Sequence, residues 1–219
     1  VTQYLSLKKS NRYLAEENAR LQSLLMALTN DSVPEYPVKD TTGKYVYHAA
    51  RVVNNSFTRR NNYLTIDIGS DKGIKPEMGV IAPNGIVGQV KDVSPHYATV
   101  ISLLHKNSRI SAGFKNSRYF GSLTWPGMNP REALLSDIAR HVKFSKGDTI
   151  VTTAYSALFP EGIMIGTVKD FEARDGSSFY SITVELSTDF TSLHYVYVVE
   201  NKHREEIKNL ESQSQSHDD

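Results

Sequence analysis

The residues that could do acid–base or nucleophilic chemistry are histidines, serines and carboxylates, because the 219-residue chain contains no cysteine. A serine hydrolase needs a histidine base, a carboxylate that orients it and an activated serine beside an oxyanion hole. The candidate histidines are His48, His96, His105, His141 and His194. The segment KGDTIVT at 146–152 begins like a protease nucleophile loop, but Thr149 stands where the serine would, and no glycine follows. G-x-S-x-G is absent too, so the sequence argues against a serine hydrolase.

Metal and phosphate sites are not indicated either. No two histidines are four residues apart, and neither H-x-x-x-H nor H-E-x-x-H occurs. The segment GSDKGIKPEMG at 69–79 lacks the Walker spacing and is typical of a turn between strands. We therefore predict that the chain is not an enzyme and has no catalytic residue, metal site or cofactor.

Charge and hydropathy narrow the range of partners. The chain has 25 basic and 24 acidic residues and a net charge of +1, whereas a nucleic-acid binder normally carries a clustered basic face. We expect no nucleic-acid partner. No apolar run approaches the roughly 18 residues of a membrane span. The sequence begins at Val1 within an already periodic segment, so we expect a membrane anchor to precede it.

The region from about residue 46 to 199 has the pattern of an antiparallel β protein. Short alternating runs, separated by turn pairs such as NG, PG and DG, predict strands at a spacing of about 8–12 residues. The predicted strands are 49–53, 63–68, 79–82, 85–93, 98–104, 109–114, 119–125, 132–138, 148–153, 164–171, 180–186 and 194–199. Six short strands in about 75 residues close most easily into a small barrel without exposed edges.

The two sets of six strands are related. Residues 85–93 and 164–171 share G-x-V-K-D, and Gly88 and Gly166 are 166 − 88 = 78 positions apart. A repeat of this length indicates duplicated domains. Strands could exchange between such halves, an alternative that the sequence leaves open. The predicted fold is mainly β, with a coiled-coil helix at 1–30, a linker at 31–45, β-barrel 1 at 46–117, β-barrel 2 at 118–199 and a flexible polar tail at 200–219. Within this tail, HREEIKNLES at 203–212 could form a short helix.

The first 30 residues carry a leucine at every seventh position. In this heptad, position d holds Leu7, Leu14, Leu21 and Leu28, and position a holds Tyr4, Asn11, Asn18 and Leu25. Asparagine at position a favours a parallel two-stranded coil, because it pairs with its own copy across the seam. We predict a homodimer with these residues as its seam. The alternative is an amphipathic helix that packs on its own domain.

One apolar loop is a candidate binding site for a protein partner. In SALFPEG, residues 156–162, Leu158 and Phe159 precede Pro160, and Glu161 could supply a polar rim. Large apolar side chains beside a turn are typical of binding hot spots. The alternative is structural: these side chains could plug a barrel or join the two barrels.

Three motifs in the β region resemble a known family. They are G-I-x-P-x-M-G-V at 73–80, N-G-I-V-G-x-V at 84–90 and F-P-x-G-I-x-I-G-x-V at 159–168. Together with the leucine-repeat helix that precedes them, they resemble the MreC family of bacterial rod-shape-determining proteins over about residues 46–199.

The resemblance implies a short cytoplasmic end, one helix through the inner membrane, a dimerising coiled coil and two β-barrels on the periplasmic side. It implies a non-enzymatic scaffold that maintains cell shape by organising peptidoglycan-synthesis enzymes. The implied partners are a class B penicillin-binding transpeptidase, MreD, the RodA glycosyltransferase and, indirectly, MreB filaments. The alternatives are a periplasmic adaptor of an export system, which would carry a helical hairpin within its β region, and a chymotrypsin-like protease.

Overall fold

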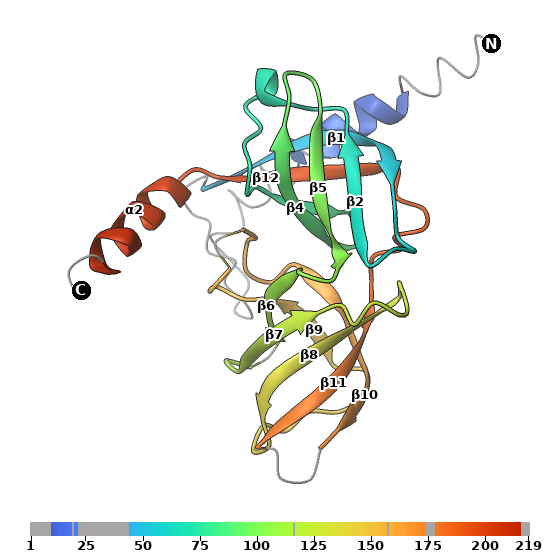
Figure 1. Ribbon diagram of the computed structural model, residues 1–219, viewed down its shortest axis with the longest axis vertical. Coiled ribbons are helices and arrows are strands. Elements are labelled where there is room, and N and C mark those ends of the chain that lie inside the picture. Colours follow the sequence, from blue (N-terminus) through green and yellow to red (C-terminus); the bar gives the residue numbers. More distant parts are fainter. Residues whose placement is uncertain are drawn as a thin grey trace.

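The computed structural model describes residues 10–18, 20–21, 44–115, 117–156, 158–173 and 178–215. The chain forms two closed six-stranded barrels, which lie one above the other in Figure 1. A helical segment, residues 10–18 and 20–21, lies beside the first barrel, and helix α2 (Arg204–Gln215) follows the last strand. Neither helical segment in these ranges is long and apolar enough to cross a membrane.

Barrel 1 has the ring order β1-β12-β3-β4-β5-β2. Its strands are β1 (Tyr45–Asn55), β2 (Asn61–Ile66), β3 (Gly79–Ala82), β4 (Gly85–Val93), β5 (Ala98–His105) and β12 (Tyr195–Asn201). A 3-10 turn, η1 (Ser70–Lys72), lies between β2 and β3. Strand β2 shows the alternation that a barrel strand requires. Its buried residues are Asn62, Leu64 and Ile66, whereas Asn61 and Tyr63, which alternate with them, are exposed. This period of two places every second side chain in the core.

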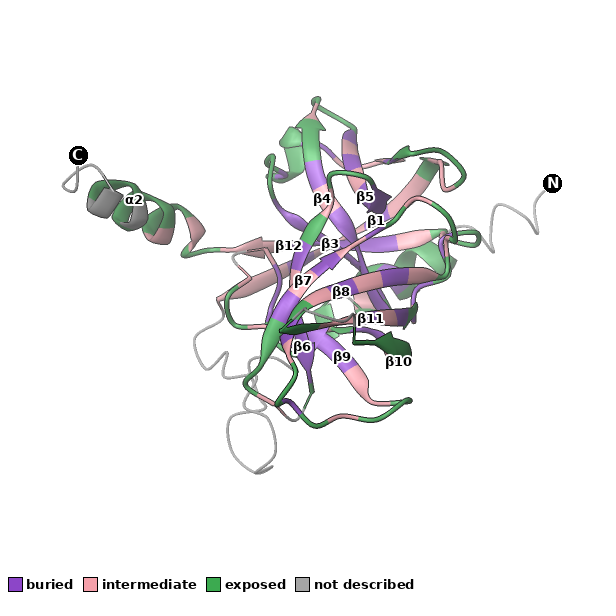
Figure 2. Cartoon of the chain, turned by 60° about the horizontal axis from the view of Figure 1, so that its bottom comes forward, coloured by how far each residue is buried: buried purple, intermediate pink, exposed green. Residues whose placement is uncertain are grey.

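Barrel 2 has the ring order β10-β11-β8-β7-β6-β9. Its strands are β6 (Arg109–Phe114), β7 (Phe120–Thr124), β8 (Glu132–Ala139), β9 (Thr149–Thr152), β10 (Met164–Glu172) and β11 (Phe179–Leu186). Figure 2 shows buried residues along the strands of both barrels, whereas α2 is largely exposed. All twelve predicted strands are therefore confirmed, and β1 begins four residues earlier than predicted (49 − 45).

The predicted assignment of strands to the two barrels is wrong for two strands, β6 and β12. Strand β6, which was assigned to barrel 1, pairs with β7 and β9 of barrel 2. Strand β12, which was assigned to barrel 2, pairs with β1 and β3 of barrel 1. The two rings have the same order of strands if β12 in barrel 1 corresponds to β6 in barrel 2. Barrel 1 therefore obtains its sixth strand from the C-terminal end of the β region. The structure therefore contains the strand exchange that the sequence left open, because β6 and β12 each belong to the other barrel than predicted.

The two ends of the chain also depart from the predicted segments. Residues 204–215 of the predicted flexible tail form α2, and residues 200–201 belong to β12. Most of the predicted coiled coil, and all of the linker except its last two residues, lie outside the described residues.

The internal duplication is visible in the positions of two glycines. A Cβ on Gly88 would lie 2.0 Å from the carbonyl oxygen of Ile101, and one on Gly166 would lie 2.0 Å from that of Glu185. Both barrels therefore need glycine where the neighbouring strand approaches closely. Both repeats also shift register two residues later, between Val90 and Asp92 in β4 and between Val168 and Asp170 in β10.

The barrels are joined by buried contacts. The Phe159 side chain, from the loop between β9 and β10, is 1% exposed, and a Cβ on Gly79 of β3 would lie 2.8 Å from its ring. Glycine at position 79 leaves the space that the ring occupies. The hydroxyl of Thr188, in the segment from β11 to β12, donates to the carbonyl of Ile86 in β4 at 3.0 Å. Phe159 thus has the structural role that the sequence left as an alternative.

Replacing Phe159 with alanine should reduce the free energy of unfolding by about 3–5 kcal/mol, because it empties a buried aromatic site between the barrels. Denaturant unfolding followed by circular dichroism measures the loss. The control is Phe179→Ala, since Phe179 is 48% exposed and its loss should cost about 0.5 kcal/mol or less. Equal costs for the two variants would contradict a role of Phe159 in joining the barrels.

Candidate interaction surfaces

Four of the five candidate histidines make side-chain contacts, and none of these contacts is with a serine. Backbone N–H of Asn107 donates to Nδ1 of His105 at 3.0 Å, and Nε2 lies 3.2 Å from the Tyr63 hydroxyl. Burial lowers the pKa of His105, which favours the neutral ring that accepts this bond. The other contacts join His48 to Glu200, His96 to Asp71 and His141 to Tyr119. No group of three or more His, Asp or Glu side chains within the described ranges could hold a metal ion.

Barrel 2 carries an aromatic surface, which we define as Tyr119, Phe120, Tyr155 and His141. The three aromatic side chains are 48%, 45% and 73% exposed. The rings of Phe120 and Tyr155 lie 4.5 Å apart, and Tyr119 meets His141 edge-on at 5.1 Å. Tyr119 and Phe120, where β7 begins, thus contact the turn after β8 and the loop after β9. Large exposed aromatic clusters are rare on isolated proteins and mark sites of association.

The two turns beside the aromatic surface are basic. The turn between β6 and β7 contains Lys115 and Arg118, and the turn after β8 contains Arg140 and Lys143; all four are exposed. The contact between Tyr119 and His141 holds these turns together. The surface therefore combines apolar rings with a positive rim, which suits a partner with an acidic edge around an apolar centre.

The structure separates the three residues predicted to bind a partner. Leu158 is half-buried and Glu161 is exposed, but the ring of Phe159 is enclosed between the barrels. The loop that carries them, residues 153–162, also carries Tyr155 of the aromatic surface, a residue that the sequence analysis did not select. Partner binding by this loop stays a prediction. The ring of Phe159 is buried in this structure, so it cannot contact a partner.

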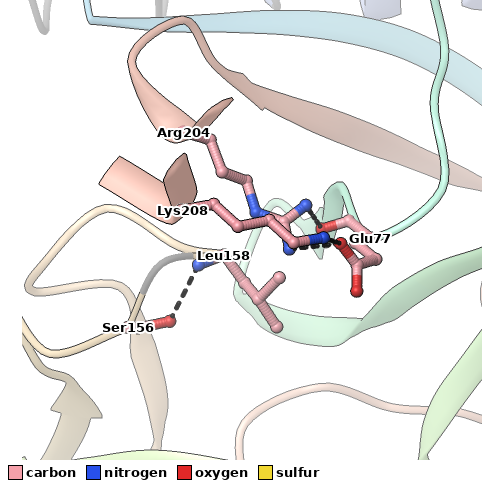
Figure 3. A network of polar contacts seen from close by, with 5 residues as sticks. All are labelled: Glu77, Ser156, Leu158, Arg204 and Lys208. Atoms are coloured by element: carbon pink, nitrogen blue, oxygen red, sulfur yellow. Dashed lines mark hydrogen bonds and ion pairs between the residues drawn. The ribbon is translucent and has the colours of Figure 1, made fainter. Parts of the chain in front are cut away.

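Helix α2 is fastened to barrel 1 by one glutamate (Figure 3). Arg204 donates to the backbone carbonyl of Glu77 at 2.7 Å and to its carboxylate at 3.0 Å, and Lys208 donates to the same carboxylate at 3.1 Å. These contacts, that of Lys208 first, lower the pKa of Glu77. Glu77 has a φ of 68°, in the left-handed region, and both its carbonyl and its carboxylate contact Arg204 of α2.

The same network borders a small groove at the meeting point of the barrels. A cavity of about 70 Å³ is lined by residues of barrel 1 and α2, with Leu158 from barrel 2 beside them. Figure 3 shows Leu158 next to the Glu77 network, with its backbone N–H directed at the Ser156 hydroxyl. Helix α2 therefore lies at one edge of the predicted partner loop.

The N-terminal helical segment contacts barrel 1 through the side that holds Ala15, which is 6% exposed. Leu14 and Leu21 of the predicted seam are 56% and 48% exposed. Burial raises the pKa of the Tyr197 hydroxyl, and a contact with Asn18 opposes this rise. The remaining described seam residue is Asn11, while Tyr4, Leu7, Leu25 and Leu28 lie outside the described residues.

Replacing Glu77 with glutamine should loosen α2, because it removes the negative charge that two cations share. The side chain of Glu77 is 49% exposed, so we expect a loss of about 0.2–1 kcal/mol in the docking of α2. Hydrogen exchange of the α2 amides measures it. In the unchanged protein the contribution should be complete above the ordinary pKa of 4.5 and should disappear as pH falls through the lowered pKa. The control is Glu205→Gln, a like change of charge on α2 itself; if it loosens α2 as much, the Glu77 network does not hold the helix.

Comparison with known proteins agrees with the fold. The family model described as "Rod shape-determining protein MreC, barrel core" matches residues 52–200. The cell shape-determining protein MreC of Listeria monocytogenes is 29% identical over 192 residues, which is 84% of this chain and 64% of that protein. This chain thus spans slightly less than two thirds of that relative's length.

Two solved structures are similar to this one. MreC from Listeria monocytogenes has a TM-score of 0.66 at 25% identity, over 91% of this chain and 93% of the other. A chain in the complex between penicillin-binding protein PBP2 and MreC from Helicobacter pylori has a TM-score of 0.59 at 16% identity, over 73% of this chain and 99% of the other, and so shares its fold. Because the family model covers most of the sequence and both barrels, this chain belongs to the MreC family of rod shape-determining proteins.

Proposed function

We propose that this chain is a non-enzymatic scaffold of the bacterial cell-elongation machinery, which maintains cell shape by organising peptidoglycan-synthesis enzymes. The observation that carries the proposal is the exposed aromatic surface on the second barrel of a chain from this family. A scaffold needs binding surfaces, and the exposed rings on barrel 2 supply one.

The proposed partner at the aromatic surface is a class B penicillin-binding transpeptidase. The Helicobacter pylori protein complex supports this choice, because a chain of this fold occurs there together with a penicillin-binding protein. Tyr155 connects the surface to the loop with Leu158 and Glu161, so we extend the proposed interface along residues 153–162. Tyrosine and phenylalanine supply large contact areas at low cost in conformational entropy, which suits them as anchors.

The proposed scaffold is a homodimer that is tethered to the inner membrane by an anchor N-terminal to this sequence, with both barrels on the periplasmic side. Leu14 and Leu21, which are exposed at a seven-residue spacing, support pairing of two helices. Two tethered copies would present their partner-binding surfaces together, which raises avidity through effective concentration. MreD, RodA and, indirectly, MreB filaments are further proposed partners from the resemblance to the family.

The export-adaptor alternative is less favourable. Such an adaptor would carry a helical hairpin within its β region, whereas between β1 and β12 the described residues contain one helical element, the three-residue turn η1. The protease alternative has no support from the contacts of the candidate histidines described above.

The double variant Phe120→Ser, Tyr155→Ser should weaken binding of the transpeptidase by about tenfold or more, because both rings are proposed anchors. Titration calorimetry with the periplasmic part of the cognate class B enzyme measures the affinity. Stability should change little, since both side chains are exposed.

The matched control is Tyr97→Ser, in the turn between β4 and β5 of barrel 1, because Tyr97 is similarly exposed at 51%. Its affinity should equal that of the unchanged protein. Unchanged binding by the barrel 2 variant would remove the aromatic surface from the proposed interface.

The double variant Leu14→Asp, Leu21→Asp should abolish dimerisation, because pairing would bury four carboxylates (two per chain) in an apolar seam. Analytical ultracentrifugation should show a monomer, with the β signal in circular dichroism retained. The control, Tyr13→Asp, adds a charge to a helical position outside the seam that is 66% exposed, and it should leave the dimer intact. A dimer that survives the double variant is not formed by this seam.

A further inference from the structure

The helical segment, residues 10–18 and 20–21, meets barrel 1 on both sides of Ala15. On one side, Arg12 forms an ion pair with Asp67 at 3.5 Å. The Asp67 side chain is only 14% exposed and also accepts a hydrogen bond from the backbone N–H of Arg51 at 2.7 Å. It is therefore fixed in place by β1 before the helix reaches it.

On the other side, Asn18 and Tyr197 of β12 line the same groove between the helix and the barrel. The Tyr197 side chain is 2% exposed. The groove has a volume of about 660 Å³, and its lining also includes Asn11 and Leu14. Two position-a asparagines and one position-d leucine of the predicted seam thus face the same groove.

The docked helix and a two-stranded coil make conflicting demands on these residues. In a parallel coil, the residues at a and d both face the partner helix, and an asparagine at a bonds its own copy. Here Asn11, Leu14 and Asn18 face barrel 1 across the groove, on the side of the helix where a second helix would have to lie. Leu14 and Leu21 remain exposed, so the docked state leaves the apolar half of the seam uncovered.

We propose that barrel 1 competes with a second copy of the chain for this helical segment, so that docking on β1 and β12 opposes formation of the coiled coil. This inference rests on the proposed homodimer and adds to it a means of regulation. When the helix is docked, the seam is incomplete; when the helix leaves the barrel, Asn18 becomes free to pair with the partner's asparagine. The apparent dissociation constant of the dimer then rises as the fraction of chains with an undocked helix falls.

The competition predicts that damage to the docking site strengthens the dimer. Tyr197→Phe removes only a hydroxyl on the Asn18 side of the groove, and Asp67→Asn removes the charge that meets Arg12 and, within barrel 1, the Arg51 side chain. Neither substitution touches the seam, and an asparagine at position 67 can still accept the bond from the backbone N–H of Arg51. Each variant should lower the dimer dissociation constant by about two- to tenfold, the equivalent of one lost hydrogen bond or ion pair.

Sedimentation equilibrium of the whole chain over a range of concentrations measures these constants. The matched control is Tyr63→Phe, which also removes a hydrogen-bonded hydroxyl from barrel 1, but one that contacts His105. Its dissociation constant should equal that of the unchanged protein.

The outcomes are distinct. Tighter dimers for Tyr197→Phe and Asp67→Asn, or a dimer in these variants where the unchanged protein is monomeric, support the competition. Equal or weaker dimers overturn it, and weaker ones would mean that the docked helix is part of the dimer interface. Monomers in every variant at all concentrations overturn the proposed homodimer and this inference together.

Discussion

The ladder between β1 and β12 is the contact on which the remaining architecture depends. It pairs Tyr45 with Asn201 and continues to Arg51 and Tyr195, so it joins the first and last strands of the β region. Without this ladder, barrel 1 would be an open sheet with exposed edges at β1 and β12, since these two strands are neighbours in the ring. The sequence of barrel 2 is inserted between β5 and β12. Barrel 1 can therefore close only when β12, which follows barrel 2 in the chain, pairs with β1 and β3. Pairing residues so far apart in sequence raises the contact order and slows folding, with a modest cost in loop entropy.

The strands were predictable because their signal is local. An apolar residue at every second position, with Gly, Pro or Asn between runs, predicts a strand whichever sheet it joins. For the same reason the sequence could not assign β6 and β12 to their barrels: VYVV of β12 and ISAG of β6 have apolar patterns that fit either ring. Which barrel each of these strands joins depends on its pairing with strands far away in sequence, such as that of β12 with β1, and a local pattern does not contain this information. Helix α2 was assigned to a flexible tail because its composition is polar; its contact with barrel 1 comes from Glu77, far away in sequence.

The candidate surfaces were harder to predict than the fold. The sequence drew attention to the loop with Phe159, since a phenylalanine next to a Pro–Gly turn could equally be exposed or buried. The structure buries it, because Gly79 on the other barrel leaves room for the ring. Tyr119 and Phe120 were included in a predicted strand, and alternation cannot tell how exposed two adjacent aromatics at a strand end will be. The Asn18 contact with Tyr197 was also beyond a heptad argument, which assumes that position a faces another helix.

The exchange of β12 also bears on how this molecule would carry load. The chain passes between the barrels twice, at residues 106–108 and 187–194. Tension applied between the N-terminal segment and barrel 2 is therefore shared by two covalent connections in parallel, and a bend about one connection is resisted by the other. Extracting β12 means breaking its ladders with β1 and β3 on both sides at once. The two barrels thus form a linkage with resistance to stretching and twisting that a tandem pair joined by a single peptide would lack.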